Sequence, residues 1–316
     1  MKKSWLLLIV LCLTAGVFVS CNKNRAKTEK KEIVIAIIPK VDNAIFDQVK
    51  ESALNAAKEL GIVMTWEAPS TIDGIKQKEL IENLIHYKVD GILISCNDAE
   101  MLKGPINEAM KAGIKVATFD SDCPKSDRIF YVGTDNKKAG KVCAETMLNL
   151  YTKNKTKPDK IYILCGGVSA LNMIERIAGF RSAISETQIA DIGYSYEIPD
   201  YGKDLVTYNL TKNSKINGLQ MFWGVPALNG LDSFPAMTRF MKRGGVSVFF
   251  DVSRPLLRYI KENANCATMK QDFRSMGHDG VHNLYNAIKG ETYKMEILYD
   301  VKVIDHDNAE EELKKL

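Results

Sequence analysis

Short apolar runs alternate with amphipathic segments from residue 33 almost to the end of the chain. Runs such as Ile33–Ile38 are rich in β-branched residues and apolar at successive positions, which is typical of strands buried on both faces of a parallel sheet. The next segment has apolar residues at helical spacing, with Asp42 or Asn43 as a cap and Gly61 as a stop. This alternation predicts repeated βαβ units and therefore an α/β fold.

The predicted elements fall into two successive series of similar construction. Strands are expected at 33–38, 62–66, 91–95, 115–119 and 129–132 in the first series, and at 161–165, 192–198, 218–222, 246–250 and 267–270 in the second. Further helices are expected at 75–87, 101–112, 137–151, 171–184, 203–210, 227–243 and 255–263. A helix at 275–288, a strand at 295–303 and a frayed helical tail follow. Two doubly wound parallel-sheet lobes are therefore predicted.

The first residues have the pattern of an export signal. Lys2 and Lys3 precede an apolar run that ends at Val19, which is too short to span a membrane comfortably. Ser20 and Cys21 follow, and this junction resembles the lipobox of bacterial lipoproteins. We therefore expect residues 1–21 to be a lipoprotein signal peptide with its lipobox cysteine, Cys21 to be lipidated and residues 22–31 to be a tether. The alternative is an ordinary signal peptide with an incidental cysteine.

Composition and charge narrow the function classes. The chain has 316 residues, enough for two domains, and its 46% hydrophobic and 26% charged residues are ordinary for a globular protein. The formal net charge is +4, and no basic block with interleaved aromatic residues is present. These features exclude nucleic acid as a partner.

The cysteines do not suggest a framework of disulfides. Five lie beyond the lipobox, namely Cys96, Cys123, Cys143, Cys165 and Cys266. They are odd in number, far apart and without a CxxC pair, so neither disulfides nor a structural zinc site is predicted. Cys96 and Cys123 follow neighbouring strands and could lie close together.

No catalytic motif is present. The sequence lacks a GxSxG elbow, a P-loop and a GxGxxG turn. His278 and His282 have the spacing of metal ligands on a helix, but no acidic or cysteine third ligand is evident in the sequence. We therefore predict no enzyme activity, no metal site and no cofactor.

Polar and aromatic side chains follow the predicted strands in both series. In an open α/β sheet the carboxyl ends of the strands face the ligand-binding crevice. Carboxylates and amides can satisfy buried hydroxyl groups, and aromatic faces can cover a sugar ring. Helix capping is the alternative role for several of the polar residues. The candidate ligand-binding residues are Asn43, Phe46, Asp120, Ser121, Asp122, Asn172, Arg176, Tyr201, Trp223, Asp251 and Gln271.

From Ile33 to about Val303 the sequence resembles the ribose-type periplasmic sugar-binding proteins. The stretches that carry the resemblance are DNAIF (42–46), ATFDSD (117–122), GTDNKKAGK (133–141), NMIERIAGF (172–180), FFD (249–251) and ATMKQD (267–272). The resemblance implies a type I periplasmic binding protein, with two lobes joined by a three-stranded hinge. It assigns residues 32–134 and 272–294 to the N-terminal lobe, and residues 135–271 and 295–316 to the C-terminal lobe.

The resemblance also implies roles for single residues. Asn43 and Phe46 match the family's asparagine and stacking phenylalanine, Asp120 and Asp251 its two aspartates, Arg176 its arginine and Gln271 its glutamine near the hinge. Tyr201 falls where an aromatic residue commonly packs on the ring. Ser121 stands in place of an arginine, Trp223 replaces an amide residue, and Asp122 adds an acid. Ribose itself is therefore not predicted, and another pentose, a hexose, a polyol or a furanose-like signal molecule fits equally well.

These implications predict a substrate-binding lipoprotein of an ABC importer. It would capture a small sugar or polyol by closure of its hinge and present both lobes to the permease of a permease–ATPase transporter. We expect it to be an exported monomer that is lipid-anchored to a bacterial membrane. The alternatives are a sensor that docks on a histidine kinase or chemoreceptor, and a lipoprotein that binds a nucleoside or signal molecule.

Overall fold

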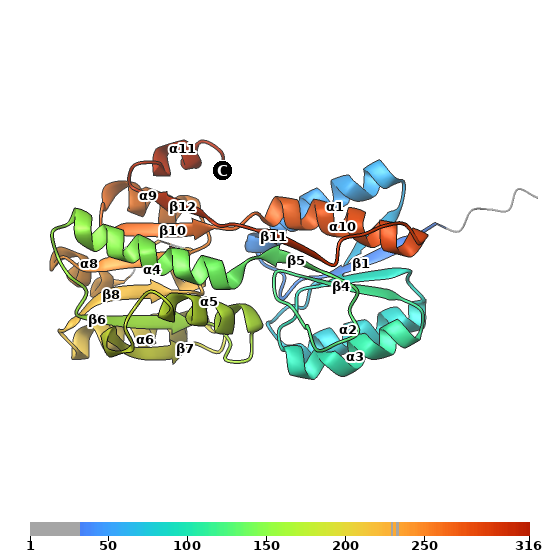
Figure 1. The fold of residues 1–316 in the computed structure, drawn as a ribbon, viewed down its shortest axis with the longest axis horizontal. Helices are drawn as coiled ribbons and strands as arrows, with labels where there is room; N and C mark the ends of the chain where they lie inside the picture. Colours follow the sequence, from blue (N-terminus) through green and yellow to red (C-terminus); the bar gives the residue numbers. More distant parts are fainter. Residues whose placement is uncertain (1–31, 229, 232–233) are drawn as a thin grey trace, which may run out of the picture. The chain divides into compact units, whose positions relative to one another are not determined.

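Each predicted series of strands forms its own six-stranded sheet. The computed structural model of the protein describes residues 32–228, 230–231 and 234–316. Figure 1 shows two α/β lobes with segments crossing between them, so the predicted fold class is confirmed. The predicted signal peptide, Cys21 and the tether at 22–31 lie outside the described residues. In the described part of the chain, no helix has the length and apolar character needed to cross a membrane.

The first sheet is wholly parallel and has the strand order β2-β1-β3-β4-β5-β11. Its elements are β1 (Val34–Ile38), a 3-10 turn (Ala44–Phe46), α1 (Asp47–Leu60), β2 (Val63–Trp66), α2 (Gly74–Tyr87), β3 (Gly91–Ile94), α3 (Ala99–Lys111), β4 (Lys115–Phe119), β5 (Tyr131–Thr134), α10 (Phe273–Lys289) and β11 (Glu296–Tyr299). Ile35 and Ile37 pack in the cluster formed with α1 and α10, whereas Ala36 and Ile38 pack in the cluster formed with α2 and α3. The continuous apolar run of β1 thus reflects burial on both faces.

The second sheet repeats this arrangement with the order β7-β6-β8-β9-β10-β12. Its lobe comprises α4 (Asn136–Lys153), β6 (Lys160–Cys165), α5 (Leu171–Arg181), a 3-10 turn (Glu186–Gln188), β7 (Ile189–Tyr194), α6 (Pro199–Lys212), β8 (Ile216–Met221), α7 (Val225–Leu228), α8 (Pro235–Lys242), β9 (Val246–Phe250), α9 (Arg254–Glu262), β10 (Cys266–Lys270), β12 (Lys302–Asp305) and α11 (Ala309–Leu313). Helices α4 and α5 cover one face, and α6 to α9 with α11 cover the other. Among the described strands of this sheet, only β12 is antiparallel to its neighbour.

The predicted strand at 295–303 is two strands in different sheets. β11 pairs with β5 in the first sheet, and β12 pairs with β10 in the second. The assignment of 295–316 to the C-terminal lobe is therefore wrong for residues 296–299. The reason is that Asp300 and Val301 carry the chain between the lobes, and a continuous extended pattern does not show which sheet each half joins.

Two helix predictions also differ from the structure. The predicted helix 227–243 is divided into α7 and α8. The tail is not frayed, because Glu312 in α11 is buried and its carboxylate receives ion pairs from Lys270 and Lys302. These partners lie on β10 and β12, so a local pattern could not reveal them.

The chain crosses between the lobes after β5, after β10 and after β11. Asp135 caps α4 by accepting from the Lys138 backbone N–H at 2.9 Å, and Asp272 caps α10 by accepting from Ser275 at 3.0 Å. In both sheets the order runs 2-1-3-4-5 from the outer strand, with a topological switch point between the first and third strands of the series. The two crevices beyond the strand ends are where a ligand site is expected.

Candidate functional site

A cavity of about 380 Å³ lies between the two lobes. It is within the size range of small-molecule sites. Eight of the eleven candidate residues line it, namely Asn43, Phe46, Asp120, Asn172, Arg176, Trp223, Asp251 and Gln271. The other three, Ser121, Asp122 and Tyr201, are not among its lining residues.

Arg176 on α5 is the most connected cationic side chain of the cavity. It is 2% exposed, and its guanidinium lies 3.7 Å from the centre of the Phe250 ring. Its Nε donates to Asn136 Oδ1 at 2.9 Å, and its terminal nitrogens donate to the Phe222 carbonyl at 3.0 Å and to Gln271 Oε1 at 2.9 Å. Each terminal nitrogen carries a second hydrogen. No described residue accepts a hydrogen bond from this second hydrogen, so a ligand oxygen can accept it.

Two close helix contacts fix the position of Arg176. A Cβ atom on Gly140 of α4 would lie 2.0 Å from the Arg176 carbonyl oxygen, and one on Gly179 of α5 would lie 1.9 Å from the Lys137 carbonyl oxygen. Only glycine permits this approach of the two helix backbones. The contact brings Arg176 next to Asn136, at the start of α4, where the chain enters the second lobe.

Asp251 and Gln271 connect the cavity to the crossing segments. Gln271 Nε2 donates to Asp251 Oδ1 at 2.7 Å, and Gln271 Oε1 accepts from Thr134 Oγ1 at 2.8 Å. Burial raises the pKa of Asp251 from 3.8 to about 6, although the charge of Arg176 and the Gln271 hydrogen bond oppose this rise. Gln271, in the crossing segment after β10, is thus hydrogen-bonded both to Asp251 at the cavity and to Thr134, where the crossing segment after β5 begins.

Asp120 and Asp251 occupy equivalent places after β4 and β9. Both have left-handed backbones, with φ of 54° and 67°, a conformation that aspartate adopts more readily than most residues. The Asp120 carboxylate accepts from Ser95 Oγ at 2.7 Å. The two lobes therefore each present one buried carboxylate to the cavity from the end of a central strand.

Asn172 provides an acceptor with free capacity, and Phe46 and Trp223 provide apolar surface. Asn172 is 4% exposed, and its Oδ1 has no hydrogen-bond partner within the described part of the chain. Phe46 packs edge-on against Phe119 with ring centres 6.2 Å apart, and Trp223 is buried in the core of the second lobe while lining the cavity. A ligand with hydroxyl groups and apolar ring faces suits this combination.

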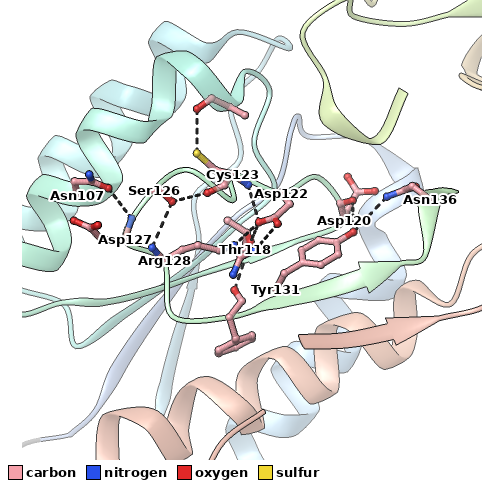
Figure 2. Close-up of polar contacts among 12 residues, drawn as sticks. Asn107, Thr118, Asp120, Asp122, Cys123, Ser126, Asp127, Arg128, Tyr131 and Asn136 are labelled. Atoms are coloured by element: carbon pink, nitrogen blue, oxygen red, sulfur yellow. Dashed lines mark hydrogen bonds and ion pairs between the residues drawn. The ribbon is translucent and has the colours of Figure 1, made fainter. Parts of the chain in front are cut away.

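Asp122 is not among the cavity-lining residues, and Figure 2 shows its side chain in contact with Thr118 and Arg128. Its carboxylate accepts from Arg128 and Thr118, so its charge is compensated within the first lobe. Ser121 is 1% exposed, and its Oγ is buried without a hydrogen-bond partner among the described residues. The left-handed turn at Asp120 separates the side chains of this run, so the prediction that all three face one ligand does not match the geometry.

Tyr201 is displaced from the cavity by the course of the preceding loop. It lies in the first turn of α6, is 43% exposed and stacks on Tyr196 with the ring planes 15° apart. β7 ends at Tyr194 rather than at residue 198, and Tyr196 and Glu197 have φ of 50° and 61°. This turn makes Tyr196 the cavity-lining residue in place of Tyr201.

Lys40 and Glu197 are charged residues of the cavity that the sequence reasoning missed. Lys40 follows β1 and is 8% exposed. Glu197 Oε1 accepts from the Gly167 backbone N–H at 2.6 Å, and burial raises the pKa of Glu197 while the charge of Lys40 lowers it. Lys40 adds a cation to the cavity, and its place just beyond the end of β1 was the available signal.

The cysteines of the described residues are free and buried. Cys123 Sγ donates to the Ala99 carbonyl oxygen at 3.0 Å (Figure 2). The cavity is lined by no cysteine or histidine among the residues that the structure describes. Its carboxylates can accept hydrogen bonds, and its cations can donate them.

Comparison with known sequences places the chain among binding proteins. Residues 34–292 match the periplasmic binding protein domain family. The ribose import binding protein RbsB of Haemophilus influenzae is 25% identical over 293 residues, which are 92% of this chain and 97% of that protein. The D-xylose-binding periplasmic protein of the same organism is 32% identical over 114 residues, which are 36% of this chain and 32% of that protein.

Solved structures with the same fold include several sugar complexes. An ABC transporter solute-binding protein from Burkholderia graminis in complex with D-arabinose is 30% identical, with a TM-score of 0.79 over 88% of this chain and 96% of that one. The XylFII–LytSN complex contains a chain that is 29% identical, with a TM-score of 0.76 over 87% of this chain and 98% of that one. The resemblance to sugar-binding proteins is therefore confirmed.

Proposed function

Because the chain belongs to the periplasmic binding protein domain family, we propose that it is the substrate-binding component of an ABC importer and captures one monosaccharide between its lobes. The cavity is the observation that carries this proposal. Within it lie Asp120, Glu197 and Asp251 as acids, and Lys40 and Arg176 as cations. Each hydroxyl group of a sugar both donates and accepts, so it needs partners of both kinds when it is buried.

The similar proteins narrow the class of sugar to test first. Two of these proteins are named for the monosaccharides ribose and D-xylose, and the third is in complex with D-arabinose. The lining of the cavity supports a ligand of this kind, since Phe46 and Trp223 supply aromatic surface and Asn172 supplies a buried acceptor without a partner among the described residues. We propose a pentose as the leading candidate and a hexose or polyol as the next.

Capture by hinge closure follows from the connections of Gln271. This residue contacts Asp251, Arg176 and Thr134 at once. A ligand that binds Asp120 of the first lobe together with Arg176 and Asp251 of the second stabilises the closed arrangement, and the crossing segments absorb the change in backbone angles. We propose the lobe boundaries 32–134 with 272–299, and 135–271 with 300–316.

The anchor and the partners complete the proposal. We propose that the chain acts outside the cytoplasm as a monomer, held on the membrane by acyl chains on Cys21, and delivers its ligand to a permease and ATPase pair without enzymatic activity of its own. Mass spectrometry of the mature chain tests the anchor: an unmodified Cys21, or cleavage at another site, would refute it.

A thermal-shift screen of ligand-stripped protein tests the central proposal. Monosaccharides, polyols and nucleosides are compared, and a ligand at about 100 times its Kd should stabilise the protein by about 2.7 kcal/mol. This corresponds to a rise in Tm of roughly 5 °C for a protein of this size. Isothermal titration with the best ligand then measures the stoichiometry. Stabilisation by nucleosides alone would overturn the sugar proposal, and no stabilisation by any compound would overturn the site.

A second candidate function is sensing through the same cavity. The similarity to the XylFII–LytSN complex shows that a protein of this fold occurs in a complex with another protein. Adjacent genes for a permease and an ATPase would support import, whereas an adjacent gene for a membrane kinase without a permease would support sensing.

A further inference from the structure

Three potential metal ligands converge on the outer surface of the first lobe, away from the residues that line the cavity. They are Glu59 near the end of α1, and His278 and His282 one turn apart on α10. Glu59 Oε2 lies 3.3 Å from His278 Nε2 and 3.1 Å from His282 Nε2. All three ligand atoms lie within 4.8 Å of one another.

These separations match those of ligands around a tetrahedral metal ion. Zinc binds histidine nitrogen and carboxylate oxygen at about 2.0–2.1 Å, so neighbouring ligand atoms of a tetrahedral site are about 3.3 Å apart. The two oxygen–nitrogen distances, 3.3 Å and 3.1 Å, are close to this value. The two imidazole rings have centres 4.5 Å apart and planes tilted by 39°, so modest side-chain rotation brings the second nitrogen to the same distance.

A second carboxylate orients one of the histidines. Asp279 Oδ1 lies 2.9 Å from His278 Nδ1, and Asp279 Oδ2 accepts a hydrogen bond from the Tyr299 hydroxyl at 2.5 Å. Because a carboxylate only accepts, this contact holds a proton on Nδ1 of His278, and Nε2, which faces Glu59, is the nitrogen that can bind a metal ion in exchange for a proton. Histidines that bind zinc are commonly held by a carboxylate in this way.

The backbone that carries these ligands is rigidly packed. α1 and α10 lie side by side (Figure 1). A Cβ atom on Gly277 would lie 2.3 Å from Ser52 Oγ and 2.5 Å from the Val49 carbonyl oxygen, so glycine allows the two helices to approach. The next residue, His278, is thereby fixed relative to α1. A site built on two packed helices is more preorganised than one built on loops.

We propose that Glu59, His278 and His282 form a zinc-binding site that joins α1 to α10. The two nitrogens and one carboxylate oxygen supply three protein ligands of the kind that zinc prefers. The side chains are 34–56% exposed, so water completes the coordination from the solvent side. In the metal-free protein, hydrogen bonds join the Glu59 carboxylate to the two histidine rings, and the metal ion replaces the protons of these hydrogen bonds. The site stabilises the first lobe and does not depend on the sugar-binding proposal.

Isothermal titration of zinc into chelator-treated protein without a histidine tag tests the site. One zinc ion per chain is expected. The His278→Ala/His282→Ala double variant lacks two of the three ligands and should lose zinc binding at this site, whereas Asp279→Asn should lose about 10–100-fold in affinity. The matched control is His86→Ala, an exposed histidine on α2 outside the cluster, which should bind as the parent does.

Thermal unfolding with and without zinc supplies a second measurement. Zinc should raise the Tm of the parent and of His86→Ala, but not that of Glu59→Gln. The Glu59→Gln substitution keeps the size of the side chain, so it tests the site even if the double variant folds poorly. Equal zinc affinity in the parent and Glu59→Gln, or no zinc binding by the parent in the micromolar to millimolar range, would overturn the proposal.

Discussion

Replacing Asp251 by asparagine should stabilise the ligand-free protein while weakening its affinity for sugar. Burial raises the pKa of this carboxyl group to about 6, from an ordinary value of 3.8. The folded protein therefore holds a proton on Asp251 more tightly than the unfolded chain does. An asparagine has no charge to bury, and its Oδ1 can still accept the hydrogen bond from Gln271 Nε2.

The pH dependence has a definite sign. Well below pH 3.8 the group is protonated in both states, so it does not affect stability. Between 3.8 and about 6 the folded state binds more protons, so the free energy of unfolding falls as pH rises. Above about pH 6 the free energy of unfolding stays lower by the full amount. This amount is about 3 kcal/mol, which corresponds to the gap between the two pKa values. The Asp251→Asn substitution should remove this cost, with a gain of about 3 kcal/mol at pH 7 and about 1 kcal/mol at pH 4.5.

Thermal unfolding of ligand-stripped protein between pH 4.5 and 7.5 measures the difference. At pH 7 the Asp251→Asn variant should have a Tm higher than the parent by roughly 5 °C. Asp200→Asn is the matched control, because the Asp200 side chain is 91% exposed and the substitution changes the same charge. Titration with the best sugar should show a loss of roughly tenfold or more, since a hydrogen bond to a charged group contributes about 1.5–3 kcal/mol. A variant no more stable than the parent at pH 7, or a difference that is the same at every pH, would refute the reasoning.

Five further substitutions test the packing and the site. Arg176→Met should lower the free energy of unfolding by about 3–5 kcal/mol in urea denaturation, because it leaves buried charge uncompensated; an unchanged midpoint would contradict this. Gly179→Ala should destabilise by about 1–3 kcal/mol through its clash with the Lys137 carbonyl. Gly104→Ala, in α3 with no atom within 4 Å of the new methyl group, should instead gain up to about 1 kcal/mol; the same sign for both would disprove the packing argument. Trp223→Ala should weaken sugar binding roughly tenfold by titration and Tyr201→Ala less than about twofold, so a larger loss for Tyr201 would reverse the assignment.

The central strands were predictable because they are buried on both faces. A continuous apolar run such as Ile33–Ile38 is a local signal, and most strands were found within a few residues. The exceptions depend on partners far away in the chain. The run at 295–303 divides between two sheets, and the tail is ordered by the ion pairs of Glu312 with β10 and β12.

A candidate site residue was predictable where its place directly after a strand is enough to put it at the cavity. Asp120, Asp251 and Gln271 follow strands directly and line the cavity. Side-chain direction in the turns was not predictable, because single left-handed residues decide it. Asp122 contacts Arg128 and does not line the cavity, and the turn at residues 196–197 places Tyr196 and Glu197, but not Tyr201, at the cavity.

The sequence by itself determined the α/β class, the two similar lobes and the strand ends where polar groups collect, since all of these follow from local periodicity and residue type. Tertiary structure alone decided which polar groups share a space. Glu59 and His282 are 223 residues apart, yet their ligand atoms are 3.1 Å from each other because two helices pack on one face of a sheet. No local pattern contains this information, because proximity across the chain depends on how the sheets and helices pack.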